Sequence, residues 1–193
     1  MRSEPVLPFY VVYDDSLSMK DHLDELNRGL RELHRAVTAD PVVSSGTRFC
    51  LIGFSDSAEI LLPLSRHSEI TEICRLTAGA ASNFGAVFRL LRDTIARDVD
   101  TLNGQGQQVY QPAVFFLSDG QPTDPATWPS AFAALTDPTW SGRPLMIAFG
   151  LGDADPATIG RIGTCRAFLC QDGVSAGAAL CDAYMSCLLL VHG

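Results

Sequence analysis

The chain has 193 residues, of which 47% are hydrophobic and 19% charged, and its formal net charge is −8. This composition indicates a folded protein with a sizeable core and excludes a disordered chain. Lys20 is the only lysine and no basic run exceeds two residues, which argues against binding of nucleic acid or of a membrane surface. No signal peptide precedes the first apolar run, and no apolar run could span a bilayer, so we expect a cytoplasmic protein.

Apolar runs alternate with helical spacings along the chain, which predicts strands alternating with helices. In the first half of the chain we expect a strand at 7–13, a helix at 20–37, strands at 47–54 and 58–64, and helices at 69–76 and 84–99. An exposed loop at 102–111 should then lead to a strand at 113–117 and a helix at 128–135. The chain should end with a strand at 145–149, a turn at 150–155, a helix from Pro156, a strand at 166–170 and a helix at 175–191. Only three polar residues separate the second and third strands, so the third should be an antiparallel edge strand. The pattern predicts one α/β domain over 1–193. We expect a doubly wound, Rossmann-like fold, with a mainly parallel six-stranded sheet and helices on both faces.

Polar residues follow the first strand at every second position: Asp14, Ser16 and Ser18. A carboxylate and two hydroxyls are hard oxygen ligands of the kind that Mg²⁺ prefers. The alternative interpretation is an ordinary strand-to-helix turn, in which Ser16 or Ser18 caps the helix that follows.

Two more polar loops can reach the same place. Ser82 lies in a loop of small residues before a predicted helix, and Asp119 directly follows the apolar strand at 113–117. In a doubly wound sheet, ligands bind at the carboxyl ends of the strands, where the strand order reverses. If the first and fourth strands are neighbours, all three loops should meet there.

These three motifs resemble the metal-ion-dependent adhesion site of von Willebrand factor A domains. That site combines D-x-S-x-S, a threonine in a glycine-rich loop before a helix, and an aspartate in an Asp-Gly motif after an apolar strand. The resemblance implies that Mg²⁺ or Mn²⁺ is held by Asp14, Ser16, Ser18, Ser82 and Asp119. It also implies that a carboxylate of a partner protein fills an open position on the metal, without catalysis. Two positions depart from the motif, since Leu17 replaces the usual glycine and Ser82 the usual threonine.

The third loop continues as Gln121-Pro122-Thr123-Asp124, which is similar to the TerY branch of this family, the bacterial tellurium-resistance proteins. Met19 and the segment 28–31 also suit that branch. The resemblance implies a tellurium-resistance or stress-response setting, with kinase-like and phosphatase-like proteins as partners.

Two other functions compete with this interpretation. A haloacid-dehalogenase-type phosphatase would use Asp14 as its nucleophile and Ser118 after a later strand. Its general acid, however, should be an aspartate where Ser16 stands, and it needs a downstream lysine. The second alternative is a structural scaffold of the same fold whose metal site is vestigial.

The chain has six cysteines, at 50, 74, 165, 170, 181 and 187, and none forms a C-x-x-C pair. Such residues can form a zinc or redox site, or they can be reduced core thiols. Because most lie inside apolar segments, we expect reduced thiols that bind no metal.

Overall fold

The computed structural model describes residues 5–72, 79–170, 178 and 180–185. Six strands form one sheet in the order β3-β2-β1-β4-β5-β6. The strands are β1 (Leu7–Asp14), β2 (Thr47–Phe54), β3 (Ala58–Ser65), β4 (Ala113–Ser118), β5 (Leu145–Leu151) and β6 (Arg166–Cys170). Neighbouring strands are parallel except for β2 and β3, which are antiparallel. The expected mainly parallel sheet with one antiparallel edge strand is confirmed, and so is the expected contact between the first and fourth strands.

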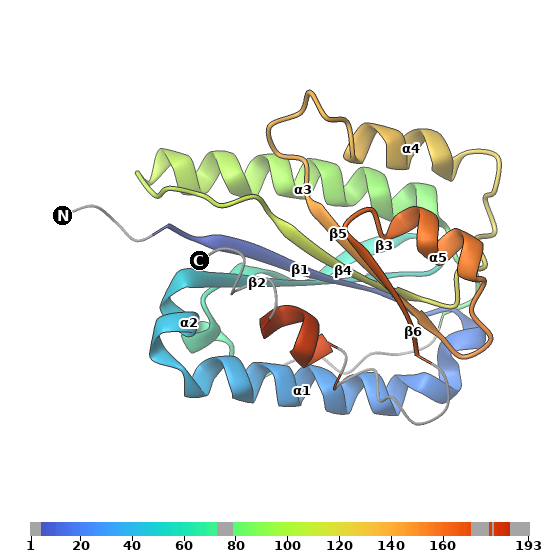
Figure 1. Cartoon of the computed structure of the whole chain (residues 1–193), viewed down its shortest axis with the longest axis horizontal. Coiled ribbons are helices and arrows are strands. Elements are labelled where there is room, and N and C mark those ends of the chain that lie inside the picture. Colours follow the sequence, from blue (N-terminus) through green and yellow to red (C-terminus); the bar gives the residue numbers. More distant parts are fainter. Residues whose placement is uncertain (1–4, 73–78, 171–177, 179, 186–193) are drawn as a thin grey trace.

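Helices cover both faces of the sheet, as expected (Figure 1). They are η1 (Leu17–His22), α1 (Leu23–Ala39), α2 (Pro41–Gly46), η2 (His67–Glu69), α3 (Phe84–Gly104), α4 (Trp128–Leu135) and α5 (Pro156–Ile162), where η marks a 3₁₀ helix. α1 and α2 lie on one face with the helical residues 180–185, and α3, α4 and α5 lie on the other. Among the described residues, no helix is long and apolar enough to cross a bilayer.

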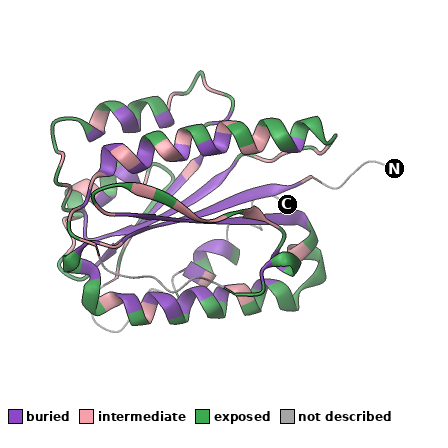
Figure 2. Cartoon of the chain, turned by 180° about the vertical axis from the view of Figure 1, so that it is seen from behind, coloured by how far each residue is buried: buried purple, intermediate pink, exposed green. Residues whose placement is uncertain are grey.

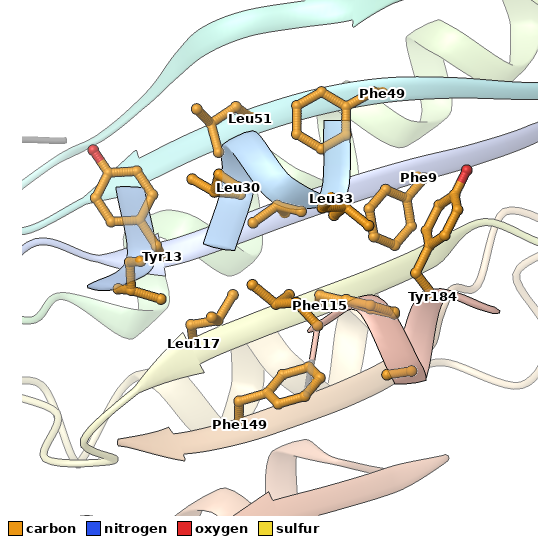
Figure 3. Packing of buried hydrophobic residues seen from close by; sticks show 14 of the residues in the cluster. Phe9, Tyr13, Leu30, Leu33, Phe49, Leu51, Phe115, Leu117, Phe149 and Tyr184 are labelled. Atoms are coloured by element: carbon orange, nitrogen blue, oxygen red, sulfur yellow. The ribbon is translucent and has the colours of Figure 1, made fainter. Parts of the chain in front are cut away.

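Each face of the sheet has its own core. Alternate residues of β1 point to opposite sides, so Phe9 packs toward α1 while Tyr10 packs toward α3. β1, β2 and β4 are buried along their whole length, as expected for central strands covered on both faces. Figure 2 shows these strands in the buried colour, with exposed residues on the outer faces of the helices. Figure 3 shows the α1 side, where Leu30 and Leu33 lie among sheet residues such as Phe9 and Phe115.

The structure corrects several expected boundaries. No helix begins at Glu69, because Glu69 ends η2 and residues 70–72 are not helical, while Ile70 is extended and buried. The other residues of that predicted helix, 73–76, lie outside the described residues. The predicted loop at 102–111 begins too early, because α3 continues to Gly104 and buries Leu102. β5 also extends to Leu151, beyond the predicted strand end.

Other segments are only partly described. The expected closing helix at 175–191 lies partly outside the described residues, but 178 and 180–185 are helical. The four cysteines that the structure describes are free, at 50, 165, 170 and 181. Cys74 and Cys187 lie outside the described residues, so the state of all six thiols stays a prediction.

His67 is a buried polar group under the edge of the sheet. Its side chain is 2% exposed, and neither ring nitrogen has a hydrogen-bond partner among the described residues. The ring centroid lies 5.7 Å from that of Phe49 and 5.8 Å from that of His34. Burial lowers the pKa of His67 to about 4, and the nearby His34 and Arg48 add to this shift. The native protein therefore holds this imidazole neutral.

This burial makes the fold sensitive to acid. An unfolded histidine has a pKa of about 6.5, so the unfolded chain binds a proton more readily than the native protein. Above about pH 6.5 His67 is neutral in both states and does not lower the free energy of unfolding. As the pH falls from about 6.5 toward about 4, the free energy of unfolding decreases, with a slope of up to about 1.4 kcal/mol per pH unit. We expect His67→Phe to reduce the loss of melting temperature between pH 7 and pH 5.

The measurement is a series of thermal melts across this pH range. His22→Gln is the control, because it removes a histidine from the end of η1 and leaves His67 in place. An unchanged pH dependence in His67→Phe would contradict the assignment.

Candidate metal centre

Asp14 is the centre of the candidate site. It ends β1 beside the end of β4 and is completely buried. Its Oδ1 accepts hydrogen bonds from the Ser16 amide at 3.0 Å and the Ser82 hydroxyl at 3.1 Å. Its Oδ2 accepts a hydrogen bond from the Ser118 hydroxyl at 2.6 Å. Burial raises the pKa of Asp14, the hydrogen bonds from Ser118 and Ser16 oppose that shift, and the charge of Asp119 adds to it.

The two serines of the first loop (residues 14–18) turn toward each other rather than cap the helix. Ser16 precedes η1, but its side chain makes no capping hydrogen bond. Its hydroxyl instead lies 3.0 Å from that of Ser18. Ser16 is buried beside Asp14, whereas Ser18 is exposed at the rim. The side-chain cap that the alternative interpretation requires is therefore not formed by Ser16, and the role of the two hydroxyls as metal ligands stays a prediction.

Asp119, in the third loop (residues 118–124), carries an unpaired buried oxygen. Its Oδ1 accepts a hydrogen bond from the Gln121 amide at 3.0 Å. Its Oδ2 is buried and has no hydrogen-bond partner among the described residues. Burying a carboxylate oxygen without a hydrogen-bond partner costs free energy, and a bound cation or a hydrogen-bond donor would reduce that cost. This oxygen, the nearby Asp14 carboxylate and the serine hydroxyls form a hard, anionic set of the kind that Mg²⁺ or Mn²⁺ prefers. The residues present therefore fit the expected metal.

The second loop (residues 79–85) is joined to both of the others. The Ser82 carbonyl accepts a hydrogen bond from the Thr123 amide at 2.9 Å. The Asn83 amide donates to the Ser55 carbonyl at 2.8 Å, and the Gly79 amide donates to the Asp15 carbonyl. The structure thus brings the second loop against the first and the third, as the strand order predicts.

Sequence reasoning missed the structural role of Ser118. Its hydroxyl donates to Asp14 and accepts a hydrogen bond from the Gly120 amide at 2.9 Å. The available signal was its place at the end of the strand beside Asp14. Within the described ranges, no three His, Cys, Asp or Glu side chains gather closely enough to hold a metal. The candidate centre depends instead on serine hydroxyls.

Comparison with known proteins supports this fold. No protein-family profile matches the chain, and no curated protein matches its sequence. Three similar solved structures are a pilus adhesin, a byssus protein and a bacterial von Willebrand factor type A protein. SpaC from Lactobacillus rhamnosus GG has 13% identity and a TM-score of 0.71 over 96% of this chain and 30% of that chain. Proximal thread matrix protein 1 from the mussel byssus, with a zinc-occupied MIDAS motif, has 16% identity and a TM-score of 0.68 over 95% and 48%. The von Willebrand factor type A protein from Catenulispora acidiphila has 16% identity and a TM-score of 0.66 over 95% and 42%.

The fold is therefore that of von Willebrand factor A domains. The chain spans less than half the length of each of these three chains. None of their descriptions names a tellurium-resistance protein, so the TerY branch gains no support from them.

The hydrogen bonds at Asp14 predict how its variants behave without metal. Asp14→Asn keeps the size of the side chain and removes a charge that is buried close to Asp119. We expect it to be more stable than the unsubstituted protein in EDTA. Asp14→Ala leaves the hydroxyls of Ser82 and Ser118 without their acceptor, and this should cost about 1–3 kcal/mol relative to Asp14→Asn. Denaturant unfolding of the three proteins in EDTA checks this order, and a less stable Asp14→Asn would contradict it.

Proposed function

We propose that this chain is a metal-dependent protein-interaction module. Asp14, Ser16, Ser18, Ser82 and Asp119 would supply the protein oxygens for one Mg²⁺ or Mn²⁺. The bound ion would supply positive charge and an open position for an acidic residue of a partner protein. The observation that carries the proposal is Asp119 Oδ2, a buried acceptor without a hydrogen-bond partner among the described residues, in the same site as a second buried carboxylate.

The chemistry of the oxygens supports the choice of metal. All the side chains of the set offer oxygen, whereas zinc sites usually contain cysteine sulfur or histidine nitrogen. Because the proposed ligands are all oxygens, we propose a site for Mg²⁺ or Mn²⁺ in the cell. Zinc should still be compared in any titration, because the similar motif in the mussel byssus protein is occupied by zinc.

We propose binding rather than catalysis. A haloacid-dehalogenase-type phosphatase needs the carboxylate after the first strand as a nucleophile that its substrate can reach. Here Asp14 is completely buried, and both of its oxygens accept hydrogen bonds. Ser118 is also completely buried, with its hydroxyl directed at Asp14. The burial and hydrogen bonds of Asp14 and Ser118 therefore favour a binding site over a pair of catalytic residues that a substrate could reach.

For the cellular setting we propose a cytoplasmic tellurium-resistance or stress-response system with kinase-like and phosphatase-like partners. The support for this setting is the segment from Gln121 to Asp124 and its similarity to the TerY branch. Capture of partners from the native host, with Mg²⁺ or with EDTA, would test it.

The metal itself gives the first test. A ligand that binds only the native state raises its stability by mass action, by about 2.7 kcal/mol at one hundred times the dissociation constant. Mg²⁺ or Mn²⁺ should therefore raise the melting temperature, and EDTA should reverse the gain. Asp14→Ala should abolish this gain, because Asp119 is then the only carboxylate left in the proposed set. Ser82→Ala should keep weaker Mn²⁺ binding, because a water can replace one neutral oxygen.

Thermal melts and Mn²⁺ calorimetry make these measurements, with zinc run in parallel. Asp100→Ala is the charge control, because it removes one exposed carboxylate near the far end of α3. The absence of any shift at millimolar metal in the unsubstituted protein would reject the proposal. Equal losses in Asp14→Ala and Ser82→Ala would contradict the assigned roles.

A further inference from the structure

The start of α3 is capped by a residue from a distant part of the chain. Asp124 Oδ1 accepts a hydrogen bond from the Phe84 amide at 2.9 Å, and its Oδ2 accepts one from the Gly85 amide at 2.9 Å. A helix usually meets these first amides with a side chain of its own N-cap residue. Here the N-cap residue Asn83 serves only the Ala86 amide, at 2.9 Å. A carboxylate of the third loop thus holds the first two amides of the helix that follows the second loop.

The backbone leaves room for this carboxylate. A Cβ atom at Gly85 would lie 2.6 Å from Asp124 Oδ2, which is too close for the two to coexist unchanged. The carboxylate is also held from its own side, because the Thr127 hydroxyl donates to Oδ2 at 3.1 Å. The missing side chain of Gly85 thus leaves space for the Asp124 carboxylate, and the Thr127 hydroxyl helps to hold it at the start of α3.

The third loop also holds the backbone that directly follows a proposed metal ligand, Ser82. Thr123 donates its amide to the Ser82 carbonyl at 2.9 Å, and Asp124 holds the amides of Phe84 and Gly85 just beyond it. The Ser82 hydroxyl then reaches Asp14. Asp119 lies at the start of the same loop as Asp124. The segment that carries one carboxylate of the centre thus also holds the backbone from the Ser82 carbonyl to the Gly85 amide.

We propose that Asp124 is a positioning residue of the metal centre, which holds the Ser82 hydroxyl in place relative to Asp14 and Asp119. This role rests on the proposed function, because it assumes that a metal binds there. Asp124 does not touch the metal in this assignment. It acts through the backbone of α3 and through Ser82.

The decisive experiment is a double-mutant cycle on Mn²⁺ affinity. Asp124→Ala should weaken Mn²⁺ binding about tenfold, at the lower end of the range for residues that orient a metal ligand. Ser82→Ala should cost a similar factor, and the double variant should cost no more than the larger single loss, because both changes remove the same ligand. Asp124→Asn keeps one acceptor and should show an intermediate loss. It also serves if Asp124→Ala does not fold.

Two further variants separate positioning from stability. Asp40 is the local N-cap of α2, and its Oδ1 accepts hydrogen bonds from the amides of Val42 and Val43 at 3.0 and 3.3 Å. Asp40→Ala should lower the melting temperature and leave Mn²⁺ affinity unchanged. Gly85→Ala should weaken Mn²⁺ binding by displacing the carboxylate, while the melting temperature falls less than in Asp40→Ala, because alanine is the better helix former.

The outcomes distinguish this inference from the proposed function. If the unsubstituted protein binds no Mn²⁺, both are wrong. If it binds Mn²⁺ and Asp124→Ala binds equally well, only the positioning role is wrong. Losses that multiply in the double variant would also overturn the role, because Asp124 would then act independently of Ser82. A crystal structure of metal-free Asp124→Ala should show the Ser82 hydroxyl displaced from Asp14, and an unmoved hydroxyl would overturn the role as well.

Discussion

The architecture of the site depends on one fully buried carboxylate at the end of the central strand. Asp14 lies where β1 meets the ends of β2 and β4, with its side chain out of reach of water. A charge in such a place is tolerated only if donors surround it. One donor comes from the first loop, one from the second and one from the end of β4. The three loops meet at this carboxylate, and each supplies one of its hydrogen-bond donors.

These donors leave the charge only partly balanced. Serine hydroxyls and one amide are neutral groups, and Asp119 brings a second buried carboxylate. Hydrogen bonds lower the cost of burying the Asp14 carboxylate, but the nearby charge of Asp119 raises the pKa of Asp14. A divalent cation bound at the proposed site would offset both the burial of Asp14 and the repulsion between the two acids. Two buried carboxylates beside buried and exposed serine hydroxyls are therefore what distinguishes this edge of the sheet from a simple polar turn.

Most of the fold could be predicted from the sequence, because the central strands are continuous apolar runs and the long helices have clear periodicity. Asp14, Ser16, Ser18, Ser82 and Asp119 could be nominated because each follows a strand or precedes a helix at the same edge. Their ligand roles remain predictions.

The features that were predicted wrongly or missed depend on tertiary contacts. Leu102 extends α3 because it is buried against the rest of the protein, although its neighbours look like a loop. Ser118 donates a hydrogen bond to Asp14, which lies 104 positions earlier in the chain. Asp124 accepts hydrogen bonds from amides about 40 positions earlier. No local sequence pattern indicates such distant partners. The segment after Glu69 has helical spacing, but Ile70 enters the core in an extended conformation.

The position of β4 beside β1 has a consequence for how the protein folds. The hydrogen bond from Ser118 to Asp14 joins residues 104 positions apart, and all the strands between them in sequence lie on the other side of β1. Pairings of such long range close large loops and tend to form slowly. A nascent chain that has only completed β1, β2 and β3 already exposes the first acid but has no second. The proposed ligand set is complete only after β4 docks beside β1, so metal binding would report that β4 has joined the sheet.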